Sequence, residues 1–386
     1  MRRTVALIAA TGAVLASLAG CSSTSGAGAT SASNPAVKKA EAALASLGSG
    51  AVLSKGPHGE TAAPASSADL TADDIAKIKA KHATAAIVMH YGGNDWATAQ
   101  IAGLKSEFAQ LGIKLIANTD ANFKPDQQVS QLQTVMTKRP DIVVSIPTDP
   151  VATASAYKAA AAAGAKLVFM DNVPNGMTAG KDYVSDVSAD NYGNGVVSAY
   201  ELAKALGGAG KIGVVFHQAD FFVTKQRYQG FTETIKKEFP KIKVVASTGI
   251  AGPDFAGQAQ VAASAMLTKH PDLAGIWGVW DVPAEGVMAA ARAAGNQNLK
   301  IATEDLGTNV AIALAKNKLV VGLGAQRPFD QGVTEAKLGA LALLGKKTPA
   351  YVAVPALPVD HSNVLKAWQQ VYHAAPPSSV ANSFQK

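Results

Sequence analysis

Short apolar runs alternate with amphipathic stretches along most of the chain after residue 84. Continuous apolar runs predict parallel strands buried on both faces, and apolar residues recurring every three or four positions predict the helices that cover them. Strands are expected at 85–90, 114–118, 142–146, 166–170, 211–216, 243–247, 275–279, 300–303 and 320–324. Helices are expected at 98–110, 126–138, 151–163, 224–238 and 283–294, with 191–206 connecting two series. The pattern predicts an α/β protein with two doubly wound, Rossmann-like lobes.

The first residues read as a targeting segment. Arg2 and Arg3 precede an apolar stretch, too short to span a bilayer, that ends in small residues, which predicts a signal peptide over residues 1–20. Leu18-Ala19-Gly20-Cys21 resembles the lipobox of bacterial lipoproteins, which implies a lipid anchor on Cys21. The alternative is an ordinary signal peptide followed by an incidental cysteine.

Two further segments precede the alternating pattern. Residues 21–34 are rich in Ser, Gly, Ala and Thr, which favours a flexible tether. Residues 35–82 form an N-terminal extension, with a helical composition at 35–47 and a second helix capped by Thr71. The extension has no assigned function.

Composition excludes several classes of function. The 386 residues suffice for two domains, and a single Cys excludes an internal disulfide framework. The net charge of +7 comes from scattered Lys and Arg, so no nucleic-acid footprint is expected. The seven His lack metal-ligand spacing, and the G-x-G-x-x-G at 208–213 precedes a predicted strand instead of following one. We therefore expect no metal, no cofactor and no nucleic-acid partner.

Polar and aromatic residues gather just after the predicted strands. In open α/β sheets, ligands bind beyond the carboxyl ends of the strands. Rings cover the apolar faces of a sugar, while carboxylates, amides and Arg hydrogen-bond its hydroxyls. The strand ends supply both kinds of group, at His90 to Trp96, Pro147-Thr148-Asp149, Asp171-Asn172, His217, Phe255, Trp280-Asp281, Glu304-Asp305 and Gln326-Arg327.

From about Ala85 to Val359, the order of these motifs resembles the ribose/galactose-binding class of bacterial solute-binding proteins, the extracytoplasmic receptors of ABC sugar importers. The motifs that carry the resemblance are Asn94-Asp95-Trp96, Ile146-Pro147-Thr148-Asp149, Phe169-Met170-Asp171-Asn172, Ser188-Ala189-Asp190-Asn191, Arg227 to Phe231, Pro253-Asp254-Phe255, Trp280-Asp281, Glu304-Asp305 and Gly324-Ala325-Gln326. Ile146, Asn172 and Trp280 depart from the family pattern, which has Asn, Arg and Asn there.

The resemblance implies a periplasmic binding protein type I fold, with three hinge crossings near Ser188, Gln326 and Pro355. The implied lobes are 83–189 plus 327–354 and 190–326 plus 355–375, followed by a tail at 376–386. Closure over a ligand, an importer permease and ATPase as partners, a monomeric state and a place on the outer face of the cytoplasmic membrane are also implied. The implied ligand-binding residues are Asn94, Trp96, Asp171, Asn172, Arg227, Phe255, Trp280, Asp281, Asp305 and Gln326.

The departures and the charge narrow the expected ligand. Ile146 and Asn172 remove two polar contacts typical of ribose recognition, which argues against ribose itself. Several acids face a single arginine, and this excess opposes an anionic ligand. We expect a neutral sugar, polyol or sugar-like solute. A sensor that presents its ligand to a membrane signalling partner is the alternative function, and glycoside hydrolysis is disfavoured because no single acid stands out as desolvated.

Structural roles remain open for some of these residues. Asp171 and Asp305 could cap the helices that follow them, and Arg227 could pair with Glu233 on its own helix. Trp277 and Trp280 are expected on opposite faces, with Trp280 favoured for the cleft. Trp96 could be a packed aromatic at a helix start. His90 and His217 end paired strands and could edge the cleft, although a structural role is favoured for each.

Overall fold

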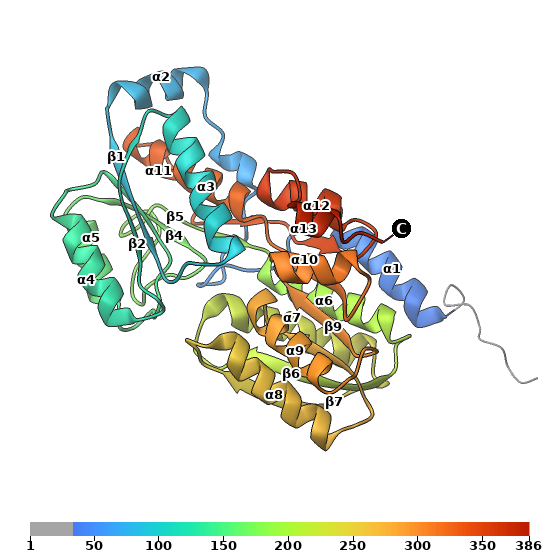
Figure 1. The fold of residues 1–386 in the computed structure, drawn as a ribbon. Coiled ribbons are helices and arrows are strands. Elements are labelled where there is room, and N and C mark those ends of the chain that lie inside the picture. The colour runs from blue at the N-terminus through green and yellow to red at the C-terminus, as the bar shows by residue number, and fades with distance from the viewer. Residues whose placement is uncertain (1–33, 386) are drawn as a thin grey trace, which may run out of the picture.

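The computed structural model describes residues 34–385 and shows two α/β lobes, one above the other in Figure 1. Each lobe is built on a six-stranded sheet, with the order β11-β5-β4-β3-β1-β2 in the first and β12-β10-β9-β8-β6-β7 in the second. All pairs are parallel except β10 with β12, which is antiparallel. This confirms the predicted architecture of two doubly wound lobes.

The first-lobe strands are β1 Thr84–Met89, β2 Lys114–Asp120, β3 Ile142–Ser145, β4 Lys166–Met170, β5 Ser185–Ala189 and β11 Tyr351–Val354. The second-lobe strands are β6 Gly210–His217, β7 Ile242–Ile250, β8 Leu273–Gly278, β9 Lys300–Glu304, β10 Val320–Ala325 and β12 Leu357–Val359. Most residues of the central strands are apolar and buried, because helices cover both faces of each sheet.

Helices α3 and α11 pack together on one face of the first sheet, and α4 packs with α5 on the other (Figure 1). In the second lobe, α6 packs with α7 and α8 with α9. The helices of the two lobes are α3 Asp95–Gln110, α4 Pro125–Met136, α5 Ala154–Ala162, α6 Asn191–Ala205, α7 Phe222–Glu238, α8 Phe255–Lys269, α9 Asp281–Ala293, α10 Thr308–Ala315, α11 Pro328–Leu343, α12 Val364–Tyr372 and α13 Ser378–Ala381. Helix α13 lies within the predicted tail and packs against α10.

Within the alternating part of the chain, the sheet order requires three passages between the lobes. They lie between β5 and α6, between β10 and α11, and between β11 and β12. The first and third passages are bonded to each other, since the backbone N–H of Asp190 donates to Val354 O at 2.8 Å. The two lobes are therefore joined by a compact hinge.

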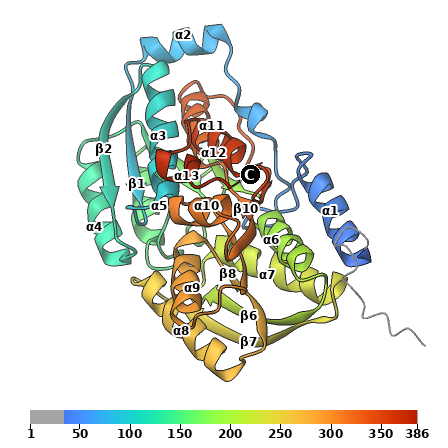
Figure 2. The ribbon, with the colours of Figure 1, turned by 45° about the vertical axis from the view of Figure 1, so that its right-hand side comes forward.

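The N-terminal extension is ordered and contacts both lobes. Its helix α1 (Pro35–Leu47) packs on α6 and β12 of the second lobe, whereas η2 (Ala65–Ala68) and α2 (Ala72–Ala80) pack on α11 of the first (Figure 2). Thr71 caps α2 as predicted, accepting from Asp74 N while the Asp74 carboxylate accepts from Thr71 N.

Candidate functional site

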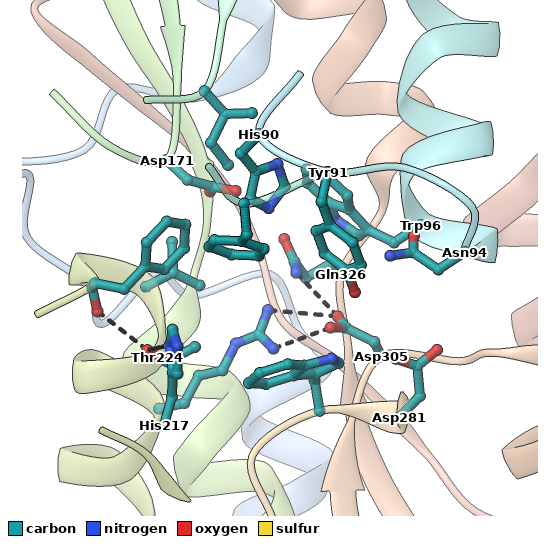
Figure 3. A pocket seen from close by; sticks show the side chains of 16 residues that line it. His90, Tyr91, Asn94, Trp96, Asp171, His217, Thr224, Asp281, Asp305 and Gln326 are labelled. Atoms are coloured by element: carbon teal, nitrogen blue, oxygen red, sulfur yellow. Dashed lines mark hydrogen bonds and ion pairs between the residues drawn. The ribbon is translucent and has the colours of Figure 1, made fainter. Parts of the chain in front are cut away.

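A cavity lies between the lobes, at the carboxyl ends of both sheets (Figure 3). Its free space is about 60 Å³, room for roughly four to six waters. The first lobe contributes His90, Tyr91, Asn94, Trp96, Phe123, Ile146 and Asp171. The second contributes His217, Phe221, Val223, Thr224, Arg227, Trp280, Asp281, Asp305 and Gln326. The position beyond the strand ends is the one that the strand pattern predicted.

Arg227 is fixed by the close crossing of α6 and α7. A Cβ atom on Gly230 would collide with Tyr192 O, and one on Gly195 with Arg227 O, so only glycine allows the two backbones to meet here. The contact brings Arg227 beside Asn191, whose Oδ1 accepts from Arg227 Nε at 3.0 Å. The arginine is thus positioned by packing before any ligand binds.

The positive charge of Arg227 is compensated by an ion pair with Asp305. Its Nη1 donates to Asp305 Oδ2 at 2.9 Å and to Val279 O at 3.3 Å. Gln326 Nε2 donates to Asp305 Oδ1 at 2.9 Å (Figure 3). Both partners of this ion pair are buried. Arg227 is the one lysine or arginine among the lining residues that the structure describes, so the pocket has no further cation for an anionic ligand.

Two other carboxyls line the cavity without a cationic partner of their own. Asp171 accepts from Ser188 Oγ at 2.6 Å, and burial raises its pKa to about 6. Asp281 accepts from Val282 N at 2.9 Å, and burial, followed by repulsion from Asp305, raises its pKa well above the ordinary range. Asp171, with a pKa of about 6, is mostly ionised at neutral pH and opposes the binding of an anion.

Aromatic rings from both lobes form the walls. His90 stacks on Phe221 across the cleft, with ring centroids 5.8 Å apart, and meets Trp96 edge to face at 5.9 Å. Trp280 meets His217 edge to face at 5.5 Å. Burial lowers the pKa of His90 to about 3 and that of His217 to about 4, so both imidazoles are neutral at physiological pH.

Four buried polar atoms of the lining side chains have no hydrogen-bond partner among residues 34–385. They are His90 Nδ1, Trp96 Nε1, Trp280 Nε1 and Gln326 Oε1. Buried polar groups are normally paired, so these atoms are candidates to bond a ligand. The two indole nitrogens can only donate and the amide oxygen can only accept. A hydroxyl group, which donates and accepts, can satisfy either kind.

Eight of the ten implied ligand residues line this cavity: Asn94, Trp96, Asp171, Arg227, Trp280, Asp281, Asp305 and Gln326. Asn172 does not. Its Nδ2 donates to Pro147 O at 3.2 Å and its Oδ1 accepts from Phe222 N at 3.2 Å, so it joins the lobes beside the pocket. Phe255 also lies outside the lining; its ring packs edge to face on Trp280 at 4.9 Å and on Phe123 of the first lobe at 5.6 Å, so it lies between the lobes beside the lining rings.

The structure decides most of the open alternatives. Asp171 and Asp305 cap no helix: both adopt positive φ (61° and 65°), and the N-cap of α10 is Gly307. Arg227 pairs with Asp305, while Glu233 accepts from Tyr192 Oη at 2.7 Å.

Trp280 lines the cavity, whereas Trp277 and Glu304 lie outside the lining. Trp277 is fully buried and stacks on Phe231 at 4.7 Å, leaving Trp280 for the cleft. Glu304 lies behind the pocket, where it accepts from Ser198 Oγ at 2.8 Å, and burial raises its pKa to about 8.

Several lining residues were not among the implied ligand residues. Phe123 follows β2 at φ 57°, and Phe221 follows β6. Tyr91 lies in the same loop as Asn94 and Trp96, which the resemblance implied as ligand-binding residues. The rule that selects strand ends would have found all three had it been applied to every residue of those loops. His90 and His217, for which a structural role was favoured, also face the cavity.

Residues 34–385 contain neither a metal-ligand cluster nor a helix that could span a membrane. No group of three or more His, Cys, Asp or Glu could hold a metal ion. Every described helix falls short of the length and apolar character that a membrane span needs.

Comparison with known proteins gives consistent matches. The family model for a periplasmic binding protein domain matches residues 85–347. The ribose import binding protein of Salmonella typhimurium is 26% identical over 304 residues, which cover 79% of this chain and 96% of that protein. The D-apiose import binding protein of Actinobacillus succinogenes is 24% identical over 249 residues, covering 64% of this chain and 77% of that protein.

Solved structures agree with these matches. An ABC transporter solute binding protein from Agrobacterium vitis with bound allitol superposes with a TM-score of 0.67 at 26% identity, covering 74% of this chain and 98% of that one. An ABC sugar transporter subunit from Rhodobacter sphaeroides superposes with a TM-score of 0.64 at 25% identity, covering 73% and 99%. The relatives described here are named as binding proteins or transporter subunits, not as enzymes.

Proposed function

Since the chain belongs to the periplasmic binding protein domain family, we propose that it captures a small neutral sugar, polyol or sugar-like solute between its lobes and delivers it to an ABC importer. Membership already makes it a binding protein of the sugar and polyol transport class, not an enzyme. The ligand class, the delivery step and the roles of the lining residues are the proposed part.

The unpartnered polar atoms between aromatic walls carry the proposal. Asp305 compensates the charge of Arg227. The aromatic rings and the uncharged or acidic groups of the lining are therefore the groups proposed to recognise the ligand. Trp96 and Trp280, on opposite lobes, offer ring surface for C–H groups and N–H donors for hydroxyl oxygens. A neutral polyhydroxylated solute matches this set, whereas an anion would meet Asp171 and Asp281.

The site residues are proposed to act from both sides of the cleft. Asn94, Trp96 and Asp171 hold the ligand from the first lobe, and Arg227, Trp280, Asp281, Asp305 and Gln326 hold it from the second. Closure of two hinged lobes excludes water and strengthens each hydrogen bond, and it creates the surface that an importer reads.

Family membership implies a location outside the cytoplasm. We further propose the signal peptide at 1–20, lipidation of Cys21 and a tether at 21–34 that holds the protein on the outer face of the membrane. Cys21 and the segment up to residue 33 lie outside the described residues. The proposed partners are an importer permease and ATPase, and the proposed state is a monomer. Import is favoured over signalling because several relatives are named as import proteins.

A thermal-shift screen over pentoses, hexoses, polyols and amino sugars tests the ligand class. A ligand at a hundred times its Kd adds about 2.7 kcal/mol of stability, a shift that is easily measured. Trp96→Ala is expected to abolish the shift, whereas Gln110→Ala, exposed on the same helix, is expected to leave it unchanged. Binding of a sugar acid or sugar phosphate, with no response to neutral sugars or polyols, would contradict the proposal.

The neighbouring genes test delivery. An importer permease and ATPase encoded beside this chain support it. A sensor kinase or chemoreceptor there, with no permease, supports the signalling alternative instead.

A further inference from the structure

The segment from Gly48 to Ala63, here called the strap, passes over the hinge and is bonded to both lobes. It links α1 on the second lobe to η2 and α2 on the first. We propose that the strap is a fourth connection between the lobes and that it holds them in the closed arrangement. This goes beyond the proposed function, because it concerns how the lobes move and not what they bind.

The strap is anchored to the second lobe at two places. Leu44 and Leu47 of α1 are buried with Val196 and Val197 of α6, which fixes the start of the strap to that lobe. Farther along, Gln226 on α7 donates from Nε2 to Lys55 O at 2.8 Å. The Gln226 side chain is buried, so this bond is sheltered from water.

At the hinge itself, the strap caps α6. Asp190, fully buried at the first passage, accepts from Ser54 N and Ser54 Oγ at 2.8 Å each and from Leu53 N at 2.9 Å. Ser54 Oγ in turn accepts from Tyr192 N at 3.0 Å. Tyr192 lies in the first turn of α6, where the backbone N–H has no partner within the helix. Ser54 is thus built into the hinge.

The strap then joins the first lobe. Gly56 lies against the Tyr351 ring of β11, and a Cβ atom there would be 2.9 Å from it. Ala63 extends the first sheet, donating to Tyr351 O at 3.0 Å and accepting from Ala353 N at 3.3 Å. Neighbouring residues Lys55 and Gly56 therefore touch opposite lobes. A hinge rotation that separates α7 from β11 must break one of these contacts.

Hydrogen bonds connect the hinge residues that the strap contacts to residues that line the pocket. Asn191, next to Asp190, donates to Ser188 Oγ at 2.9 Å, and Ser188 donates to the pocket carboxylate of Asp171. The other side of the Asn191 amide accepts from Arg227. Displacing the strap therefore acts on residues within one or two bonds of the cavity lining.

The strap lies outside the part of the chain that matches the family. The family model begins at residue 85, after the strap and α2 have ended. A segment that stabilises the closed form raises the fraction of molecules in that form. If the ligand binds the closed form more tightly, its apparent affinity rises in proportion to this fraction.

Two backbone amides report closure without any ligand. Thr308 N donates to Asp95 Oδ2 at 2.6 Å, and Phe222 N donates to Asn172 Oδ1 at 3.2 Å, both from one lobe to the other. Each is the first residue of its helix and has no carbonyl partner within it. Their hydrogen exchange is therefore slow only while the lobes are closed.

The test is hydrogen exchange in the full chain carrying Ser54→Ala and Gln226→Met. The two substitutions remove three hydrogen bonds, from Ser54 Oγ to Asp190, from Tyr192 N to Ser54 Oγ and from Gln226 Nε2 to Lys55 O. We expect exchange at Thr308 and Phe222 to rise about tenfold or more, because about 1.4 kcal/mol of lost closure energy shifts the population tenfold. Amides in β3 and β8 should keep their protection. The matched control is Ser66→Ala with Gln229→Met, at exposed positions in η2 and on α7, and it should change none of these rates.

Unchanged exchange at both amides in a folded double variant would overturn the proposal. So would an equal rise in β3 and β8, because the two residues would then support the fold as a whole. If the double variant does not fold, the exposed turn at His58 and Gly59 can be replaced by a protease site and cut after folding. The cut separates the second-lobe anchors at Ser54 and Lys55 from the pairing of Ala63 with β11, although it leaves Gly56 against the Tyr351 ring, and it should produce the same local rise. Unchanged exchange after the cut overturns the proposal equally.

Discussion

Replacing Arg227 by Met tests whether the arginine is structural as well as ligand-facing. Its side chain and that of Asp305 are 3% and 9% exposed. Without the guanidinium, Asp305 keeps Gln326 as a hydrogen-bond donor but loses its counter-charge. Asn191 Oδ1 and Val279 O each lose the donor that Arg227 supplied. The substitution therefore leaves a buried, uncompensated carboxylate and two buried acceptors without donors.

We expect Arg227→Met to lower the free energy of unfolding by about 3–5 kcal/mol, the usual cost of removing one partner of a buried pair. Adding Asp305→Leu removes the stranded charge and should restore at least about 2 kcal/mol, because replacing both ions by apolar groups is often near neutral. The double variant should therefore be more stable than Arg227→Met alone, which is the reverse of additive behaviour.

The assay is urea unfolding of the ligand-free protein, followed by far-ultraviolet circular dichroism. Equal m-values across the four proteins of the cycle would show that the same surface is exposed in each. A loss below about 1 kcal/mol for Arg227→Met, or a double variant less stable than either single variant, would refute the reasoning. Abolished ligand binding in Arg227→Met would then reflect a lost ligand contact alone.

Three further predictions follow from particular contacts. Gly230→Ala should destabilise the protein by about 1–3 kcal/mol in the same unfolding assay, because its Cβ meets Tyr192 O, whereas Gln229→Ala should not. The pKa values of His90 and His217 are lower in the folded protein than in the unfolded chain, so their contribution to stability is complete above about pH 6.5 and is lost as pH falls toward 4. Substituting both by Gln should therefore reduce the difference between the unfolding temperatures measured at pH 7 and at pH 4.5. The raised pKa of Asp171 acts oppositely, since its contribution is full below pH 3.8 and lost as pH rises through about 6. Asp171→Asn should therefore gain up to roughly 3 kcal/mol relative to wild type between pH 4 and pH 7, and a constant difference would contradict this.

The strands that the sequence predicted are apolar runs that can be recognised without knowledge of the tertiary structure. All nine predicted runs form strands, because a run such as Ile142–Ser145 can be read without knowing its neighbours. Three strands were missed. Strand β5 was missed because Ser185, Asp186 and Ser188 are polar, although all three are buried. The short strands β11 and β12 were missed as well, although the four residues of β11 are apolar and buried. Ser188 is held there by Asp171, a tertiary partner that no local pattern reveals.

The site was predictable in position but only in part by side chain. Topology places every strand end at the same edge of its sheet, so the residues after β4, β8 and β9 had to converge. Which way a side chain turns after the strand depends on packing. Asn172 turns away from the cavity to bond Pro147 and Phe222, and Phe255 packs on Trp280 outside the lining. Neither direction is encoded in the spacing of residues.

The hinge and the pocket share hydrogen bonds, so we expect ligand binding and lobe closure to be coupled in this protein. Asn191 stands at the first passage and is bonded to Ser188 on one side and to Arg227 on the other. Ser188 leads to Asp171 of the first lobe, and Arg227 leads to Asp305 of the second. A rotation of the hinge therefore changes the distance between the two carboxylates that a ligand would bridge. It follows that selectivity resides in the closed arrangement, and that any change which favours opening should weaken every ligand, not one in particular.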